Sequence, residues 1–292
     1  MSPDIPKFPD FRKITLEDIS LFNRLLSGRS PSTSELTFTN FFIWRGCDRS
    51  MVTMLNGNLC VVAYPEGEAA YLFEPIGTNM MTETISSCMS YLPRMSRVSE
   101  KTVKKYFEGK KGFKIDLDRD NSDYLYNRDD LATLKGKRYD GKRNRIKKFL
   151  KNNEPVYSVL EKDHIAGCMD LLKRWKETRK GGVCFDEPIR EAIENYEALG
   201  LSGAVVMTGG TVKAFTIGEK LNSDTAIIYI EVTDPGLEGI AQYINQRFCS
   251  EKWTDVKFIN REQDIGDAGL RKAKTSYHPV AMINKYNITI MD

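Results

Sequence analysis

The densest set of chemically useful side chains lies near the end of the chain, in the segment NREQDIGDAGLRKAKTSYHP from Asn260 to Pro279. Its two leading carboxylates, Glu262 and Asp264, could accept a proton from an amine or hydroxyl nucleophile. Its cations could anchor a carboxylate or phosphate group of a substrate. We therefore predict that Glu262 and Asp264 are catalytic and that four neighbours bind substrate: Arg261, Arg271, Lys274 and Tyr277. A purely structural cluster of ion pairs would have the same composition.

A second feature is a basic stretch at the midpoint of the chain. The eighteen residues from Leu134 to Lys151 hold nine lysines and arginines against one acid, Asp140. The stretch carries +8 and the whole chain +3, so the remaining residues sum to −5. Such a band favours a polyanionic partner, either RNA, other phosphate groups or an anionic lipid surface. The predicted phosphate-binding residues are Lys137, Arg138, Lys142, Arg143, Arg145 and Lys148. A linker helix that is basic only for solubility remains an alternative.

Apolar spacing predicts a helix through the basic stretch. Ile146, Phe149 and Leu150 follow the i, i+3, i+4 pattern of one helical face, and two asparagines after Lys151 form a plausible helix stop. We expect this basic linker helix at residues 136–153.

The helices and strands that must position these side chains fall into two halves of the chain. Each half begins with a similar spacing of apolar residues. Ile19 is followed by Leu25 and Leu26, and Ile165 by Leu171 and Leu172, at an offset of 146 residues. This echo favours an internal duplication. In the second half the predicted order is β-α-α-β-β-β-α-β-α-β, which matches acyltransferases of the GNAT type. We therefore predict a mixed α/β fold of two tandem GNAT-like units, with helices on the faces of each sheet, at residues 1–135 and 154–292.

A GNAT sheet usually splays beside its fourth strand, and the loop after that strand usually holds the pyrophosphate of acyl-CoA. The corresponding loop here is TDPGLEG, from Thr233 to Gly239. Gly236 and Gly239 could permit close backbone approach, but Asp234 and Glu238 place negative charge where a pyrophosphate would lie. The usual Arg or Gln is missing from the loop. These residues disfavour acetyl-CoA as the donor.

Bulk properties place few other limits on function. Hydrophobic content of 41% and charged content of 28% are ordinary for a globular protein. The six cysteines form neither a CxxC motif nor a cluster with histidine, so we expect no metal site. The N-terminal residues lack the apolar core of a signal peptide, and no apolar run approaches the roughly 20 residues that span a bilayer. We therefore expect a cytoplasmic protein.

Three segments resemble the signatures of a bacterial family of unassigned function that is related to the C-terminal domain of phosphatidylglycerol lysyltransferase. They are TFTNFFIWR, YLYNRDDLATLKGKRYDGKRNRIKKF and INREQDIGDAGLRKAKTSYHP. The likeness spans nearly the whole chain. The arrangement of a basic helix followed by a second unit that begins like the first is also similar to the Fem-type peptidoglycan aminoacyltransferases. In both relatives the donor is an aminoacyl-tRNA, and the acceptor is a lipid headgroup in one and a peptidoglycan precursor in the other.

The resemblance implies an aminoacyltransferase that uses aminoacyl-tRNA and needs no cofactor. Because the aminoacyl ester is already activated, the enzyme need only position the acceptor, remove a proton and stabilise the oxyanion. The expected partners are tRNA, an unidentified small-molecule or lipid acceptor and, peripherally, an anionic membrane surface. Two alternatives stay open: an acyl-CoA-dependent N-acetyltransferase of a small amine, and a non-catalytic RNA-binding or regulatory protein.

Overall fold

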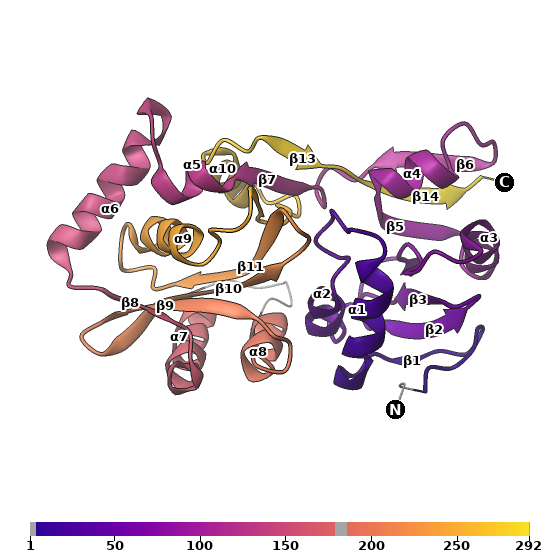
Figure 1. Cartoon of the computed structure of the whole chain (residues 1–292), viewed down its shortest axis with the longest axis horizontal. Helices are drawn as coiled ribbons and strands as arrows, with labels where there is room; N and C mark the ends of the chain where they lie inside the picture. Colours follow the sequence, from indigo (N-terminus) through magenta and orange to yellow (C-terminus); the bar gives the residue numbers. More distant parts are fainter. Residues whose placement is uncertain (1–3, 179–185, 292) are drawn as a thin grey trace. The chain divides into compact units, whose positions relative to one another are not determined.

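The computed structural model of the chain describes residues 4–178 and 186–291. They form two compact units, each built on a seven-stranded mixed sheet with helices packed against it (Figure 1). Unit 1 comprises Met1–Asp123, Gln263–Asp267 and Met282–Asp292, and unit 2 comprises Tyr124–Glu262 and Ala268–Ala281. The mixed α/β class is confirmed. The domain limits expected above follow chain order and stay a prediction, whereas each observed unit draws on separate stretches of the chain.

Sheet A of unit 1 has the strand order β1-β2-β3-β4-β5-β14-β6. Neighbouring strands of this sheet are antiparallel, except β4 with β5, which are parallel. The strands are β1 (Arg12–Lys13), β2 (Met51–Leu55), β3 (Asn58–Ala63), β4 (Tyr71–Leu72), β5 (Arg94–Ser99), β6 (Phe113–Leu117) and β14 (Lys285–Ile290). The helices are α1 (Ile19–Ser27), α2 (Phe38–Trp44), α3 (Met81–Tyr91) and α4 (Glu100–Tyr106).

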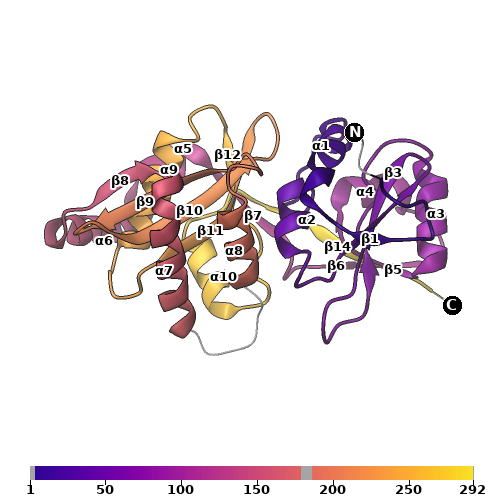
Figure 2. The same ribbon diagram turned by 90° about the horizontal axis from the view of Figure 1, so that it is seen from below.

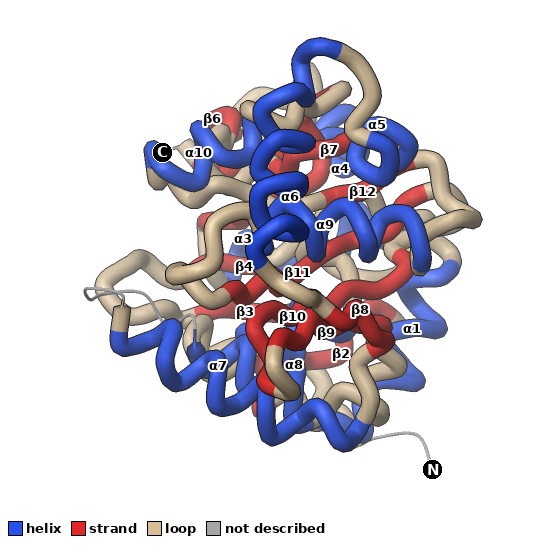
Figure 3. The backbone as a smooth tube through the Cα atoms, turned by 90° about the vertical axis from the view of Figure 1, so that its left-hand side faces the viewer, coloured by secondary structure: helices blue, strands red, loops and turns tan. Residues whose placement is uncertain are grey.

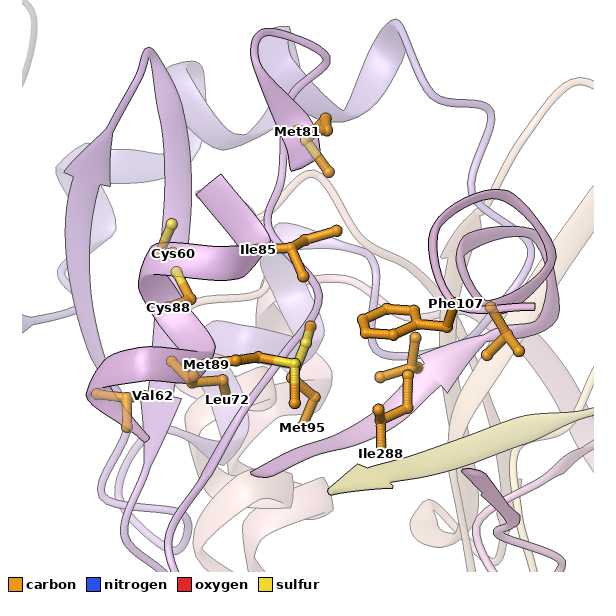
Figure 4. Close-up of a cluster of buried hydrophobic side chains, with 12 residues drawn as sticks. Cys60, Val62, Leu72, Met81, Ile85, Cys88, Met89, Met95, Phe107 and Ile288 are labelled. Carbon is orange, nitrogen blue, oxygen red and sulfur yellow. The ribbon is translucent and has the colours of Figure 1, made fainter. Parts of the chain in front are cut away.

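Local sequence explains much of unit 1. The Asn56-Gly57 turn joins β2 to β3, and both residues adopt the positive φ that such a hairpin turn requires, 52° and 79°. Alternating residues of the strands then cover the two sheet faces. Leu72 belongs to the apolar cluster beneath α3 and α4 (Figure 4), while the ring of Phe73 lies 5.0 Å from that of Phe41 on α2.

Unit 1 also buries a charged cluster. The ammonium of Lys285, on β14, is fully buried and lies 2.5 Å from Asp123 Oδ1 and 2.7 Å from Glu35 Oε2. It also donates to the Ser34 hydroxyl at 2.9 Å. Burial alone would lower the pKa of Lys285, but Asp123 and Glu35 raise it above its ordinary value. The cluster therefore consists of a cation held by two anions, and removal of one partner would leave a buried charge unpaired.

Sheet B of unit 2 has the strand order β13-β7-β12-β11-β10-β9-β8. Helices α7 and α8 lie side by side on one face, and α6 and α9 lie on the other (Figures 1 and 2). The strands are β7 (Asp123–Asn127), β8 (Val156–Val159), β9 (Ser202–Thr208), β10 (Thr211–Lys220), β11 (Thr225–Thr233), β12 (Phe258–Asn260) and β13 (Ala281–Ile283). The helices are α5 (Arg128–Thr133), α6 (Asp140–Asn152), α7 (Ile165–Glu177), α8 (Asp186–Glu194), α9 (Ile240–Glu251) and α10 (Ala268–Thr275).

Sheet B opens between β11 and β12. These two strands pair in parallel only where residues 225–227 of β11 meet residues 258–260 of β12. Strand β11 continues to Thr233, whereas β12 ends at Asn260, so the strands part beyond this short contact. The short parallel contact lies beside the strand where a GNAT sheet usually splays.

The basic stretch forms a short 3-10 turn, Lys137–Tyr139, followed by α6. Helix α6 lies beside α9 (Figure 3), and the ring of Phe149 is 5.5 Å from that of Tyr243. Of the three residues on the predicted apolar face, Ile146 and Phe149 are buried and Leu150 is 44% exposed. Among the helices of residues 4–178 and 186–291, every one falls short of the length and apolarity needed to cross a bilayer.

Candidate functional site

A basic groove lies in unit 2, where α6 and α10 approach the first turn of α9. Its volume is about 470 Å³. None of the described residues that line it has a carboxylate. Four of them are cationic: Arg138, Lys142, Arg145 and Lys272. Gln242, Ser276 and Tyr277 add polar or aromatic surface. We call this the α6–α10 groove, and its composition suits an anionic ligand.

Lys142 is the cation whose chemistry the groove changes most. Its Nζ lies 2.6 Å from Ser276 Oγ and 3.9 Å from the centre of the Tyr277 ring. Burial lowers the pKa of Lys142 to about 8, and the nearby charges of Arg145 and Arg261 act in the same direction. An anion in the groove would oppose those cations and raise this pKa, so anion binding and proton uptake by Lys142 are coupled.

The groove collects half of the predicted phosphate-binding residues. Those that line it are Arg138, Lys142 and Arg145. Lys148 instead pairs with Glu238 at 2.5 Å, and Arg143 donates to two backbone carbonyls of the preceding turn. Lys137 is exposed on the turn before α6. Arg138 also pairs with Asp130 at 2.8 Å, so within the groove Lys142 and Arg145 are the α6 cations without an ion pair among the described residues.

A partly buried polar cluster lies beside the groove, at the opening between β11 and β12. Arg261 follows β12, pairs with Glu231 of β11, and lies with its guanidinium carbon 4.8 Å from the centre of the Tyr277 ring. Glu231 also accepts a hydrogen bond from Asn245 Nδ2 at 3.0 Å. Burial alone would lower the pKa of Arg261, but Glu231 raises it above its ordinary value. The Arg261–Glu231 pair therefore bridges the strands where their backbone hydrogen bonds end.

Two polar atoms of this cluster are unsatisfied. Within the described residues, the buried Nη1 of Arg261 and the buried Oδ1 of Asn245 have no hydrogen-bond partner. Each such atom costs free energy in a protein interior, so an unused donor and acceptor at one opening in a sheet indicate a place for a polar ligand group.

The remaining predicted substrate-binding residues differ in their surroundings. Tyr277 lines the groove, and burial raises the pKa of its phenol to about 12, so the hydroxyl stays neutral. Lys274 donates from Nζ to the carbonyl oxygen of Arg261 and lies 3.4 Å from that of Glu262. Arg271 is half-buried on α10. Tyr277 and Arg261 thus meet, while the Lys274 ammonium binds the backbone just beyond β12.

The two predicted catalytic carboxylates occupy unlike positions. Asp264 is fully buried in unit 1, where it accepts from Arg119 Nη1 at 3.2 Å and from the amide of Gly266 at 3.0 Å. Glu262 is half-buried in unit 2 and has a positive φ of 54°. Its amide donates to Asn260 Oδ1 at 2.8 Å. Backbone strain of this kind gathers at functional sites, but eight other non-glycine residues among those described also have a positive φ, including Ile265 and His278. The catalytic roles of both residues stay predictions.

The TDPGLEG loop is packed against α6. Gly239 has a φ of 95°, and a Cβ atom at this position would lie 2.3 Å from the carbonyl oxygen of Arg145. Asp234 pairs with Lys213 at 3.0 Å. Helix α6 therefore lies against Gly239, the residue before α9, in the region where the usual acyl-CoA loop approaches its ligand.

Sequence reasoning missed several residues of the cluster and groove. Glu231 carried a readable signal, because it is the one carboxylate in the apolar strand TAIIYIEVT. Gln242 and Asn245 gave none, since they look like ordinary polar residues of α9.

The described residues contain no group of three His, Cys, Asp or Glu side chains placed to hold a metal ion.

Solved structures define the class of fold. FemX superposes with a TM-score of 0.56 at 9% identity, and the match covers 97% of each chain. Two seven-stranded mixed sheets in one chain are the arrangement of tandem GNAT-like proteins, and the chain has this fold. No curated protein matches the chain.

The chain belongs to the family described as "Phosphatidylglycerol lysyltransferase, C-terminal", whose model matches residues 28–289. A conserved protein of unknown function from Bacteroides thetaiotaomicron is 28% identical, with a TM-score of 0.85 over 99% of this chain and 100% of that chain. The C-terminal domain of a putative lysylphosphatidylglycerol synthetase from Agrobacterium fabrum is 15% identical, with a TM-score of 0.65 over 94% and 92%. The family resemblance seen in the sequence is confirmed.

Proposed function

We propose that this protein transfers an aminoacyl group from aminoacyl-tRNA to an amine or hydroxyl acceptor. The observation that carries the proposal is the α6–α10 groove, where four cations and no carboxylate of the described residues lie beside the Arg261 cluster. Phosphates near the aminoacylated end of a tRNA fit such a surface. The polar cluster at the open sheet then lies next to the bound end of the donor.

The proposed reaction is direct transfer. The acceptor amine or hydroxyl attacks the ester carbonyl, its proton passes to Glu262, and the ester bond to the tRNA ribose breaks as that ribose oxygen takes up a proton. Arg261 and Tyr277 orient the aminoacyl group, and Arg271 and Lys274 add positive charge near it. Asp264 is the less suitable base, because Arg119 and a backbone amide already bind its carboxylate.

Family membership supports this chemistry and suggests the acceptor. The family model carries the name of phosphatidylglycerol lysyltransferase, and the similar A. fabrum domain is described as a putative lysylphosphatidylglycerol synthetase. We propose a lipid headgroup as the acceptor, with a cell-wall precursor as the second choice because FemX shares the fold. The proposed setting is the cytoplasm, where charged tRNA is available, with peripheral contact to an anionic membrane surface.

The acyl-CoA alternative has weaker support. A pyrophosphate at the first turn of α9 would compete with α6, which lies against Gly239. It would also meet Glu238, which already pairs with Lys148 at 2.5 Å. Aminoacyl-tRNA needs no pyrophosphate site, so the close contact between α6 and Gly239 is compatible with the proposed donor.

The test measures binding of the whole protein to charged and uncharged bacterial tRNA across salt concentration, with acetyl-CoA as competitor. If all four groove cations contact phosphates, log Kd against log salt has a slope of roughly 3 to 4. Replacing Arg145 and Lys272 with alanine should lower this slope by roughly 1.4 to 1.8. The matched control replaces Lys147 and Lys151, which are exposed on the same helix but do not line the groove.

The outcomes separate the three hypotheses. Preference for charged tRNA that acetyl-CoA does not disturb, with the slope lost only in the groove variant, supports the aminoacyltransferase. An equal loss of slope in both double variants would mean that tRNA binds to the positive charge of the whole helix and not to the groove. Glu262→Gln should retain tRNA binding and lose at least tenfold in transfer of labelled amino acid to a lipid extract. Binding with no transfer to lipid or cell-wall precursor would favour a regulatory RNA-binding protein.

A further inference from the structure

Unit 1 has a second cavity, of a different kind from the α6–α10 groove. It lies between α3, the chain that follows α4, and the end of β14, and its volume is about 230 Å³. Apolar side chains make up most of its wall: Ile85, Met89, Phe107, Phe113 and Ile290. Ile85, Met89 and Phe107 also belong to the apolar cluster of Figure 4, so the cavity opens directly onto the hydrophobic core of the unit.

The size of this pocket suits part of a hydrocarbon chain. A water molecule occupies roughly 30 Å³ of the liquid, and a methylene group is of similar size, so the pocket has room for about eight such groups. Water in an apolar pocket makes few hydrogen bonds, and a hydrocarbon chain that displaced it would gain the contacts that the wall now lacks.

One cation, Lys110, lines the pocket, and Lys111 follows it in the chain, whereas Lys101, Lys104 and Lys105 line a separate pocket. Residues 101–114 contain six lysines and one carboxylate, Glu108. Lys104 and Lys114 have carboxylate partners, and Lys101 donates to a backbone carbonyl. Three of the lysines have no ion pair within the described residues, and all are exposed: Lys105, Lys110 and Lys111. Lys110 lines the pocket itself, so unpaired positive charge lies at its mouth.

We propose that this pocket binds the acyl chain of an anionic amphiphile and that Lys110 and Lys111 bind its head group. The apolar wall selects the chain, and the unpaired lysines select a negatively charged phosphate or carboxylate at its end. The ligand is either a phospholipid drawn from a membrane or a free fatty acid. The site lies wholly in unit 1, and its test requires no aminoacyl transfer. The result of that test is therefore independent of the function proposed above.

A chain-length series tests the apolar part. Calorimetric titration of the whole protein with hexanoate, octanoate and decanoate should show affinity rising about fourfold for each added methylene, because each buries a similar apolar area. The rise should level off near the length that fills the pocket. Decyltrimethylammonium, which has the decyl chain but a cationic head, should bind at least tenfold more weakly than decanoate. Equal binding of the two decyl compounds would overturn the assignment of Lys110 and Lys111.

Variants locate the site. Ser86 is exposed on α3 and lines the pocket, so Ser86→Phe should fill it and reduce decanoate binding at least tenfold without lowering the melting temperature. Ser20→Phe is the control, since Ser20 is exposed on α1 and lies outside the pocket. Lys110→Glu with Lys111→Glu should weaken decanoate binding, while Lys162→Glu with Lys173→Glu, exposed in unit 2, should not.

Vesicles distinguish the two sources of ligand. Sedimentation with phosphatidylglycerol vesicles, but not with phosphatidylcholine vesicles, that is lost in Ser86→Phe identifies a membrane phospholipid. Decanoate binding without vesicle binding identifies a free fatty acid. Failure of both probes, or equal binding by Ser86→Phe and the unaltered protein, overturns the proposal.

Discussion

Lys285→Met is the substitution whose effect follows most directly from the structure. Methionine keeps most of the length and apolar stem of lysine but removes the charge that Asp123 and Glu35 share. Both carboxylates are buried, with exposed side-chain fractions of 0% and 2%. The variant therefore leaves two like charges in the interior of unit 1 without their shared cation.

The expected cost is about 3 to 5 kcal/mol of unfolding free energy near pH 8, which is typical when one partner of a buried pair is removed. The cost should depend on pH. Asp123 keeps the amide of Ser34 at 2.8 Å, so Glu35 is the carboxylate expected to take up a proton. Burial already raises the pKa of Glu35 above its ordinary value while Lys285 opposes the rise, and loss of Lys285 should raise it further.

The sign of the pH effect follows from linkage. Between the ordinary pKa of Glu35 in the unfolded chain and its raised pKa in the folded unit, the folded state binds the proton more strongly. Stability from this group is therefore gained as pH falls through the folded pKa and lost as pH rises through it. The deficit of Lys285→Met should be largest at pH 8 and smaller at pH 5.5.

Native-state hydrogen exchange of peptides from β5 and β14 measures this quantity within unit 1, which avoids treating the whole chain as one two-state unit. Lys104→Met serves as the control, because its pair with Glu100 is exposed and should contribute little. A loss below about 1 kcal/mol at pH 8, or a loss that is the same at both pH values, would refute the argument that these charges depend on one another.

Other expectations concern unit 2. RNA affinity should fall as pH rises from 7 to 9, because Lys142, with a pKa of about 8, loses its charge; filter binding should show a flatter profile for Lys142→Gln, and an unchanged profile would exclude this lysine. Gly239→Ala should lower the melting temperature more than Gly210→Ala, since both have positive φ but only the former places a Cβ 2.3 Å from a carbonyl oxygen of α6. Equal melting temperatures would contradict that packing. Glu231→Gln should destabilise unit 2 by about 2 kcal/mol or more in urea denaturation by leaving Arg261 without its anion, and a neutral result would mean that water already reaches the pair.

Local features of the fold were predictable from sequence. The Asn56-Gly57 hairpin and the basic helix through Ile146 and Phe149 follow from turn chemistry and apolar periodicity, which depend on neighbouring residues. Leu150 belongs to the predicted apolar face and is nevertheless 44% exposed, because periodicity defines a helical face but not how much of it a neighbouring element covers.

The candidate site was predictable only in part, because its key contacts join distant residues. The sequence indicated Arg261 and Tyr277 as functional, and they do lie together. It did not indicate that Glu231, thirty residues before Arg261, would hold that guanidinium across the opening of the sheet. Nor did it indicate that Asp264 would meet Arg119, because a carboxylate in a polar loop gives no sign of which distant cation it will find.

The position of β14 has a consequence for biosynthesis. Sheet A places this last strand between β5 and β6, and its Lys285 supplies the cation for Asp123 and Glu35. A ribosome makes β5 and β6 long before β14. Until β14 is made, the edges of β5 and β6 that pair with it stay unpaired, and the carboxylates of Asp123 and Glu35 lack their cation. Sheet A can close only after β14 has been made. In a circular permutant that begins with β14, this strand and the Lys285 cation would already be present when β5 and β6 leave the ribosome.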